Sequence, residues 1–160
     1  MASTSADIAT DSSAPLSDRE LAAWRGMLQV HAGVTHQLDR QMRAEHGLSV
    51  SAYEVLMFLA DAPEHRMRMA DIADQVLLSR SGCTRLVDRL AEHGYVTRCA
   101  ADSDGRGLYA QLTGAGVTKA HAARRTHREG IRAYYLQHLT ETDQIVLGDI
   151  WRRLLATAHG

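Results

Sequence analysis

One short stretch of the sequence, residues 79–90, carries arginine and small hydroxyl side chains where a solvated helix usually carries mixed glutamate and lysine. Arginine forms paired hydrogen bonds with guanine edges and with phosphate, and serine and threonine hydroxyls bond to either group. We therefore predict that this stretch contacts double-stranded DNA. The residues assigned to base edges are Ser81, Thr84 and Arg85, and those assigned to phosphates are Ser79, Arg80 and Arg89.

Apolar residues within the same stretch recur at helical spacing. The residues at positions i, i+3, i+4 and i+7 are Cys83, Leu86, Val87 and Leu90. Residues at this spacing form one face of an α-helix, which predicts a buried face. Ser79 is suited to cap this helix, because its hydroxyl can accept a hydrogen bond from a free N–H group of the first turn. The arginine and hydroxyl side chains are then left on the surface.

Shorter elements surround this helix in the order of a helix-turn-helix followed by a β-hairpin. They are a short helix at 70–76, a turn at 77–79, strands at 95–99 and 108–112, and a third strand at 66–68. Gly94 is expected to end the second helix in a left-handed conformation. The polar loop between the two hairpin strands contains turn residues and carries Arg106 at its tip. We expect this hairpin to form a wing beside the DNA-reading helix.

The run Leu78 to Leu90, the Asp104-Gly105-Arg106-Gly107 loop and the Leu112-Thr113 that follows closely resemble the multiple-antibiotic-resistance regulator (MarR) family of winged-helix repressors. The resemblance covers about residues 18–158. It implies a mainly α-helical fold with a small antiparallel β-wing. It also implies that the second helix enters the major groove and that Arg106 enters the adjacent minor groove. We assign to Asp104 the role of orienting either Arg106 or the hairpin.

Two residues depart from the family pattern. Cys83 replaces the more usual valine or leucine, and Arg68 replaces the serine or threonine that commonly caps the first helix of the motif. Two acidic residues of this region, Asp88 and Asp104, also have a second interpretation. Either can tie the helix to the wing through an arginine such as Arg89 or Arg98, and we prefer this structural role.

The two ends of the chain carry amphipathic helices that the central motif cannot bury alone. Capping patterns predict the starts of these helices and of one helix in the central motif. The capping residues are Ser17 with Glu20, Ser51 with Glu54 in the central motif, Thr113, and Thr140 with Asp143. A homodimer in which the first and last helices of two copies interleave would cover the remaining apolar faces, and the resemblance implies the same. Its two reading helices would lie about 34 Å apart, so we expect an inverted-repeat (palindromic) operator.

The predicted organisation is a disordered tail at residues 1–16 and one domain at 17–158. Within that domain, residues 17–46 and 113–158 form dimerisation helices and residues 51–112 form the DNA-binding region. A length of 160 residues with 45% hydrophobic content fits one folded domain. The longest apolar runs are too short for a membrane span, and no secretory signal is visible, so we expect a cytoplasmic protein.

An enzyme is the first alternative function, and we reject it. The sequence shows no glycine-rich phosphate loop, no nucleophile elbow and no set of metal ligands, so we predict no catalytic residues, no cofactor and no metal. The second alternative is a winged-helix module that binds a ligand or protein without reading DNA. The arginine-bearing helix argues against that module.

The resemblance further implies that a small aromatic acid or phenol releases the repressor from DNA. The candidate ligand contacts are Trp24, Arg25, His31 and Tyr53. Plain packing at a dimer interface is the competing explanation for Trp24 and His31. A redox-sensing regulator that uses Cys83 or Cys99 is another alternative, although both positions also fit ordinary packing.

Overall fold

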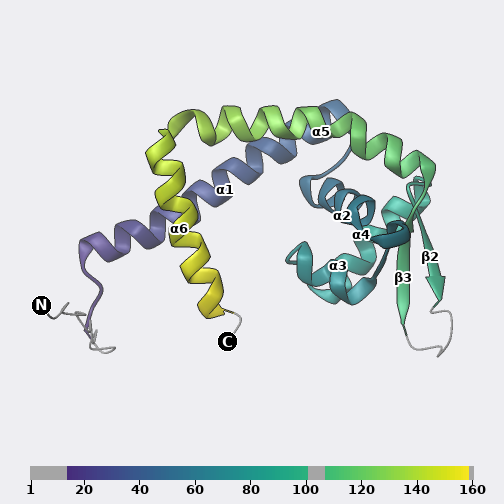
Figure 1. Ribbon diagram of the computed structural model, residues 1–160, viewed down its shortest axis with the longest axis horizontal. Coiled ribbons are helices and arrows are strands. Elements are labelled where there is room, and N and C mark those ends of the chain that lie inside the picture. The colour runs from purple at the N-terminus through teal and green to yellow at the C-terminus, as the bar shows by residue number, and fades with distance from the viewer. Residues whose placement is uncertain (1–13, 101–106, 159–160) are drawn as a thin grey trace, which may run out of the picture. The chain divides into compact units, whose positions relative to one another are not determined.

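The computed structural model describes residues 14–100 and 107–158, and it forms two compact units, residues 1–33 and 34–160. The helices are α1 (Asp18–His46), α2 (Val50–Asp61), α3 (Met69–Gln75), α4 (Arg80–Glu92), α5 (Gly114–Tyr134) and α6 (Glu141–Ala158). The strands are β1 (Arg66–Arg68), β2 (Val96–Ala100) and β3 (Leu108–Leu112), and short 3₁₀ turns span Pro63–His65 and Leu136–His138. The predicted fold class, mainly helical with a small antiparallel sheet, is confirmed (Figure 1).

The helix-turn-helix is formed by α3, a short turn and α4. The apolar face predicted for α4 is confirmed, because its buried residues are Cys83, Leu86, Val87 and Leu90. The turn contains Leu77 in a left-handed conformation (φ 55°), with 89% of its surface exposed. This is an unusual conformation for leucine, which has a Cβ atom that glycine lacks. Arg68 stands at the N-cap of α3 and makes no side-chain capping hydrogen bond.

The sheet has the strand order β1-β3-β2, and both strand pairs are antiparallel. The predicted third strand is confirmed as β1, which pairs with β3 so that Arg68 lies opposite Tyr109. In the β2–β3 hairpin, Val96 lies opposite Leu112 and Cys99 lies opposite Tyr109. The buried faces of α2, α3 and α4 and the inner residues of the sheet form one core in the unit of residues 34–160, with Val55, Leu56 and Val87 fully enclosed.

Three of the four predicted helix starts are confirmed. Ser17 and Glu20 form a reciprocal capping box, in which Glu20 Oε2 accepts from Ser17 N at 2.8 Å. Thr113 Oγ1 accepts from Gly116 N at 3.0 Å at the start of α5. Asp143 Oδ2 accepts from Thr140 N at 2.9 Å at the start of α6.

The predicted capping box of Ser51 and Glu54 is wrong. The helix begins earlier, at Val50, and its cap is Ser49, whose hydroxyl accepts from Ala52 N at 3.1 Å. A second first-turn donor, Val50 N, is satisfied by Asp39 Oδ1 of α1 at 3.0 Å. Because an acceptor from another helix satisfies this donor, α2 can begin before Ser51. The helix α5 ends at Tyr134, since Tyr135 leaves helical geometry and a 3₁₀ turn follows.

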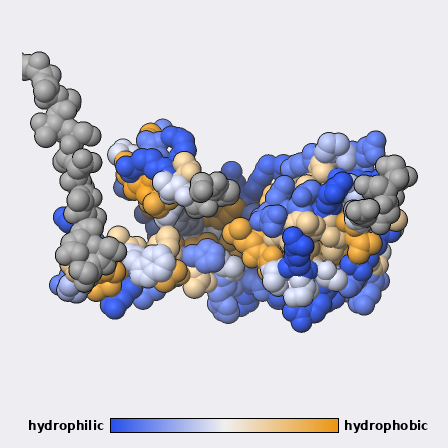
Figure 2. Space-filling view, turned by 90° about the horizontal axis from the view of Figure 1, so that it is seen from below, coloured by the Kyte–Doolittle hydropathy of each residue, from blue (hydrophilic) through white to orange (hydrophobic). Residues whose placement is uncertain are grey.

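The last helix, α6, has apolar side chains but no buried residue. Its exposed large apolar residues are Ile145, Val146, Trp151, Leu154 and Leu155. In the unit of residues 1–33, α1 likewise exposes Trp24, Leu28 and Val30. Figure 2 shows orange apolar surface on these terminal helical segments. No helix of the described ranges has the length and apolarity needed to cross a bilayer. Most of the tail predicted at 1–16 lies outside the described residues.

Candidate nucleic-acid interface

The N-terminal turn of α4 presents two hydroxyl groups, those of Ser79 and Ser81. Ser79 caps the helix by accepting from Gly82 N at 3.1 Å, and its hydroxyl oxygen lies 3.3 Å from that of Ser81. A Cβ atom at residue 82 would lie 3.1 Å from Ser79 Oγ, so glycine leaves room for this cap. A helix N-terminus of this kind favours an anion, because its first N–H groups point out of the helix.

The predicted DNA-contacting side chains lie on the surface of α4. Ser79, Arg80, Ser81, Arg85 and Arg89 are exposed, and Thr84 is half-buried. Within the described part of the chain, no side chain forms an ion pair or hydrogen bond with the guanidinium groups of Arg80, Arg85 or Arg89. These three arginines are therefore available to an external acceptor, while the opposite face of the helix holds α4 in the core.

Asp88 and Arg98 join α4 to the wing. Arg98 Nη1 lies 2.9 Å from Asp88 Oδ1, and the two side chains are 33% and 43% exposed. The preferred structural role of Asp88 is confirmed, with Arg98 as its partner. Because Arg98 is engaged in this pair, it is less free to contact a ligand than the arginines of α4.

The tip of the wing lies outside the described residues, and it includes the predicted Arg106 and Asp104. The base of the wing is described. There the guanidinium carbon of Arg66 lies 4.4 Å from the centre of the Tyr109 ring, and that of Arg68 lies 5.3 Å from it. The sequence placed Arg66 and Arg68 in a strand, with Arg68 also at the start of the next helix, and neither was predicted to bind DNA. Their alternate positions in that strand put both on one face, which was the signal for this cluster.

The predicted ligand contacts belong to two different units of the structure. Tyr53 is 4% exposed and belongs to the core, where its ring centre lies 4.5 Å from that of His127 on α5. Burial raises the pKa of Tyr53 and lowers the pKa of His127. Trp24, Arg25 and His31 are exposed and belong to the unit of residues 1–33.

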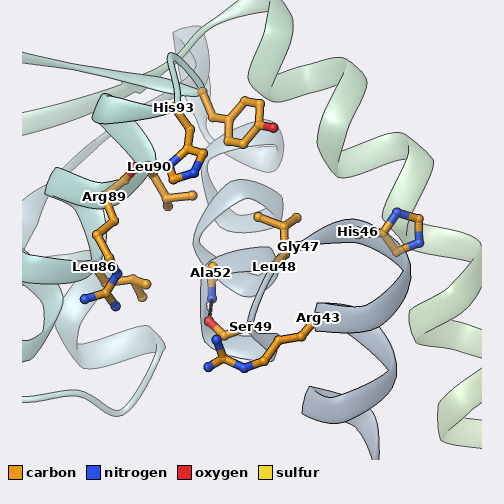
Figure 3. A pocket seen from close by; sticks show the side chains of 11 residues that line it. Arg43, His46, Gly47, Leu48, Ser49, Ala52, Leu86, Arg89, Leu90 and His93 are labelled. Atoms are coloured by element: carbon orange, nitrogen blue, oxygen red, sulfur yellow. Dashed lines mark hydrogen bonds between the residues drawn. The ribbon is translucent and has the colours of Figure 1, made fainter.

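A pocket of about 420 Å³ lies where the end of α1 approaches α4. Its lining residues are Arg43, His46, Gly47, Leu48, Ser49, Ala52, Leu86, Arg89, Leu90, His93 and Tyr95. Arg43 and Arg89 lie on opposite sides of it, and the apolar side chains of Leu48 and Leu86 also line it (Figure 3). Such a lining suits a small anion with an apolar body. The sequence reasoning missed this pocket because its walls come from segments about forty residues apart.

The two histidines of the pocket are held in different ways. His46 is turned toward α5, where its Nε2 lies 2.8 Å from Thr126 Oγ1 (Figure 3). His93 donates from Nδ1 to the backbone carbonyl of Arg89 at 2.6 Å, and its ring stacks on Tyr95 with centres 5.9 Å apart. His93 and Tyr95 therefore lie at the end of α4 beside the pocket. The backbone of Arg89 accepts the hydrogen bond from His93, and the Arg89 side chain is exposed.

Cys83 lacks the surroundings of a reactive thiol. Cys83 is 1% exposed, and burial raises the pKa of its thiol. Cys99 is half-buried, and its Sγ lies 3.7 Å from Gln111 Oε1. A redox-sensing thiol needs a lowered pKa and solvent access, so the position of Cys83 favours packing over sensing. Searched over the described residues, the structure contains no group of three or more histidine, cysteine or acidic side chains able to hold a metal ion.

Comparison with known proteins gives consistent results. A family model described as "MarR family" matches residues 46–107. The repressor YetL of Bacillus subtilis is 26% identical over 137 residues, which cover 84% of this chain and 81% of YetL. Among solved structures, the MarR family regulator AbsC of Streptomyces coelicolor is 30% identical with a TM-score of 0.84, covering 92% of this chain and 99% of AbsC.

A second solved structure contains DNA. The MarR family regulator Sco3205 of Streptomyces coelicolor, solved in complex with DNA, is 30% identical to this chain with a TM-score of 0.83. The alignment covers 89% of each chain. The relatives found by sequence and by structure are transcriptional regulators, in agreement with the prediction of a regulator rather than an enzyme.

Proposed function

This chain belongs to the MarR family of DNA-binding transcriptional regulators, and from that premise we propose that it acts as a homodimeric repressor of an inverted-repeat operator. One observation carries the proposal. The guanidinium groups of Arg80, Arg85 and Arg89 lie exposed, without a side-chain partner among the described residues, on the surface opposite the buried apolar face of α4. Ser81, Thr84 and Arg85 would read bases, and Ser79, Arg80 and Arg89 would bind phosphates. Arg106, oriented by Asp104, would enter the minor groove.

Dimerisation is supported by the apolar side chains that α6 leaves exposed. Trp151, Leu154 and Leu155 are each at least one-third exposed in the isolated chain, which is costly for a helix that faces water. A second copy of the chain would cover this face and would give the two α4 helices two-fold symmetry. The operator would then consist of two half-sites about one helical turn apart.

The experiment that tests this function is selection of binding sites from random duplex DNA, followed by footprinting and a measurement of the mass of the complex. We expect an inverted repeat bound by two protomers. Enrichment of no sequence, or of a single half-site bound by one protomer, would contradict the proposal. Binding of the protein to a promoter region that contains the selected site, together with lower transcription from that promoter in a reconstituted assay, would establish repression.

We also propose that a small aromatic carboxylate or phenolate releases the protein from DNA, and that it binds in the pocket between α1 and α4. The support is that Arg89 lines the pocket and is also a proposed phosphate contact. A ligand carboxylate on Arg89 and Arg43 would compete with DNA phosphate for the same guanidinium. The earlier set of Trp24, Arg25, His31 and Tyr53 stays an alternative prediction for this ligand.

A thermal-shift screen of phenolic acids separates the two ligand sites. We expect the stabilising ligand to lose its effect in Arg43→Ala and to keep it in Arg25→Ala. The reverse pattern would move the site to the first part of α1. Equal shifts in the parent and both variants would remove both arginines from the ligand site.

A further inference from the structure

On the outward face of the three-stranded sheet, two arginine side chains lie against the ring of one tyrosine. Arg66 and Arg68 alternate along β1 and share a face with Tyr109 of β3, which lies directly opposite Arg68. The intervening residue Met67 is half-buried and its partner Ala110 is fully buried, so the opposite face of these strands packs on the core. Arg66 donates from Nη2 to the carbonyl oxygen of Ala100 at 2.9 Å, which extends it across the sheet to β2.

Tyr109 is the residue that organises this cluster. Arg66 stacks on its ring at 4.4 Å and Arg68 at 5.3 Å, both within the range of a cation–π interaction. Arg66 is therefore held by two contacts, the ring of Tyr109 on β3 and the carbonyl oxygen of Ala100 on β2. Tyr109 is half-buried between these groups, and it therefore offers Arg68 a ring that cannot turn freely.

Arg68 is the member of the cluster that remains available to a ligand. Its side chain is exposed, and no described residue forms a hydrogen bond or ion pair with it. Its Nη1 lies 4.0 Å from the position that a Cβ atom on Gly107 would occupy, so the guanidinium lies at the point where β3 begins after the wing loop. A guanidinium at the base of the wing would face the sugar-phosphate backbone that borders the groove entered by the wing tip.

We propose that Arg68 is a further phosphate-binding residue, held in place by Tyr109, that contacts the DNA backbone beside the wing. This inference rests on the proposed function in one respect, namely that the wing lies against the duplex. The contact would add affinity without sequence preference, because phosphate is common to every sequence. Stacking on Tyr109 would lower the entropy lost when the arginine side chain binds, since the guanidinium is already ordered.

The test measures binding to duplex DNA of arbitrary sequence, about 30 base pairs long, at salt concentrations between about 50 and 200 mM. The slope of log K against log salt counts the phosphate contacts, at roughly 0.9 for each one. We expect Arg68→Ala to lower the slope by about this amount per contact while leaving the melting temperature unchanged. Arg68→Lys keeps the charge, so it should retain the slope and bind more weakly. Tyr109→Leu should also bind more weakly.

Arg125→Ala is the matched control, because Arg125 is an exposed arginine on α5 whose only recorded partner among the described residues is Glu129. It should leave both affinity and slope unchanged. A parental slope in Arg68→Ala, or an equal loss in Arg125→Ala, would overturn the inference. If the parent protein bound no duplex at any salt concentration, the proposed function would fail first and this inference with it.

Discussion

Arg98 of β2 lies 2.9 Å from Asp88 of α4, and this ion pair joins the wing to the helix that carries the exposed arginines. The pair links the two elements that we propose to enter different grooves of one duplex. Because both side chains are partly exposed, solvent screens their attraction. Its contribution to the stability of the fold is therefore small, and we expect it to act mainly by positioning the wing against α4.

The first prediction is a small coupling energy between these two residues. In a double-mutant cycle of Asp88→Asn and Arg98→Gln, we expect a coupling of about 0.2–1 kcal/mol in the free energy of unfolding. Chemical denaturation measures it. DNA affinity should fall in both single variants, because the wing is less well fixed. A coupling of zero together with unchanged DNA affinity would show that the pair has no positioning role.

The second prediction concerns base reading by Arg85. Arg85→Ala should lower the preference for the selected operator over random duplex by about 1–3 kcal/mol, because a bidentate contact to a base edge is lost. Competition binding with the two duplexes measures this difference. Arg89→Ala should instead weaken binding to both duplexes alike, since phosphate carries no sequence information. If Arg85→Ala weakened both duplexes equally, Arg85 would be a phosphate contact.

The third prediction concerns the wing tip. Arg106→Ala should weaken operator binding and lower the salt slope by about one unit, because a cation is removed from the minor groove. Fluorescence anisotropy over a salt series measures both quantities. Binding as tight as that of the parent at every salt concentration would show that Arg106 does not enter the DNA.

The fourth prediction is that Gly116 is required for the packing of α5 on the hairpin. A Cβ atom there would lie 2.6 Å from Leu112 Cδ1 and would overlap the carbonyl oxygen of Tyr95. That oxygen already accepts a hydrogen bond from Thr113 N at 3.0 Å, so it cannot move freely. Gly116→Ala should lower the free energy of unfolding by about 1–3 kcal/mol, as overpacking does.

Gly114→Ala is the matched control for Gly116→Ala. Gly114 lies in the same first turn of α5, and a Cβ atom there would meet nothing within 4 Å. Its replacement should be neutral or slightly stabilising, because alanine has less backbone freedom to lose than glycine. Equal destabilisation by both substitutions would point to the helix start rather than to the contact with Tyr95.

The fifth prediction is a loss of stability on acidification that depends on His127. Burial against Tyr53 lowers the pKa of His127 in the folded state. The unfolded chain, with an ordinary histidine pKa of about 6.5, then binds more protons than the folded chain as the pH falls. The free energy of unfolding should therefore decrease as the pH drops from about 7 through 6.5 toward the folded pKa.

His127→Phe keeps an aromatic ring against Tyr53 and removes the titrating group. Its unfolding free energy should change less between about pH 7 and pH 5 than that of the parent. His121→Gln replaces an exposed histidine on the same helix and should keep the parental profile. A His127→Phe profile that runs parallel to the parent over this range would assign the pH dependence to other groups.

The sequence by itself determined the features that depend on local spacing. The buried face of α4, the caps at Ser17, Thr113 and Thr140, and the order of helices and strands were all predicted correctly. Each of these rests on residues within about two helical turns of one another, where periodicity and capping chemistry are visible in the sequence. The exposure of the arginines on α4 follows from the same spacing, once its apolar face is buried.

The tertiary structure alone decided which distant segments meet. It made Ser49 rather than Ser51 the cap of α2, because Asp39 of α1 satisfies the first donor of that helix. It buried Tyr53 against His127, placed Arg43 and Arg89 in one pocket, and stacked Arg68 on Tyr109. These contacts depend on strand register and on how helices pack. The free energy of packing comes from residues that are distant in the sequence, so local patterns cannot predict it.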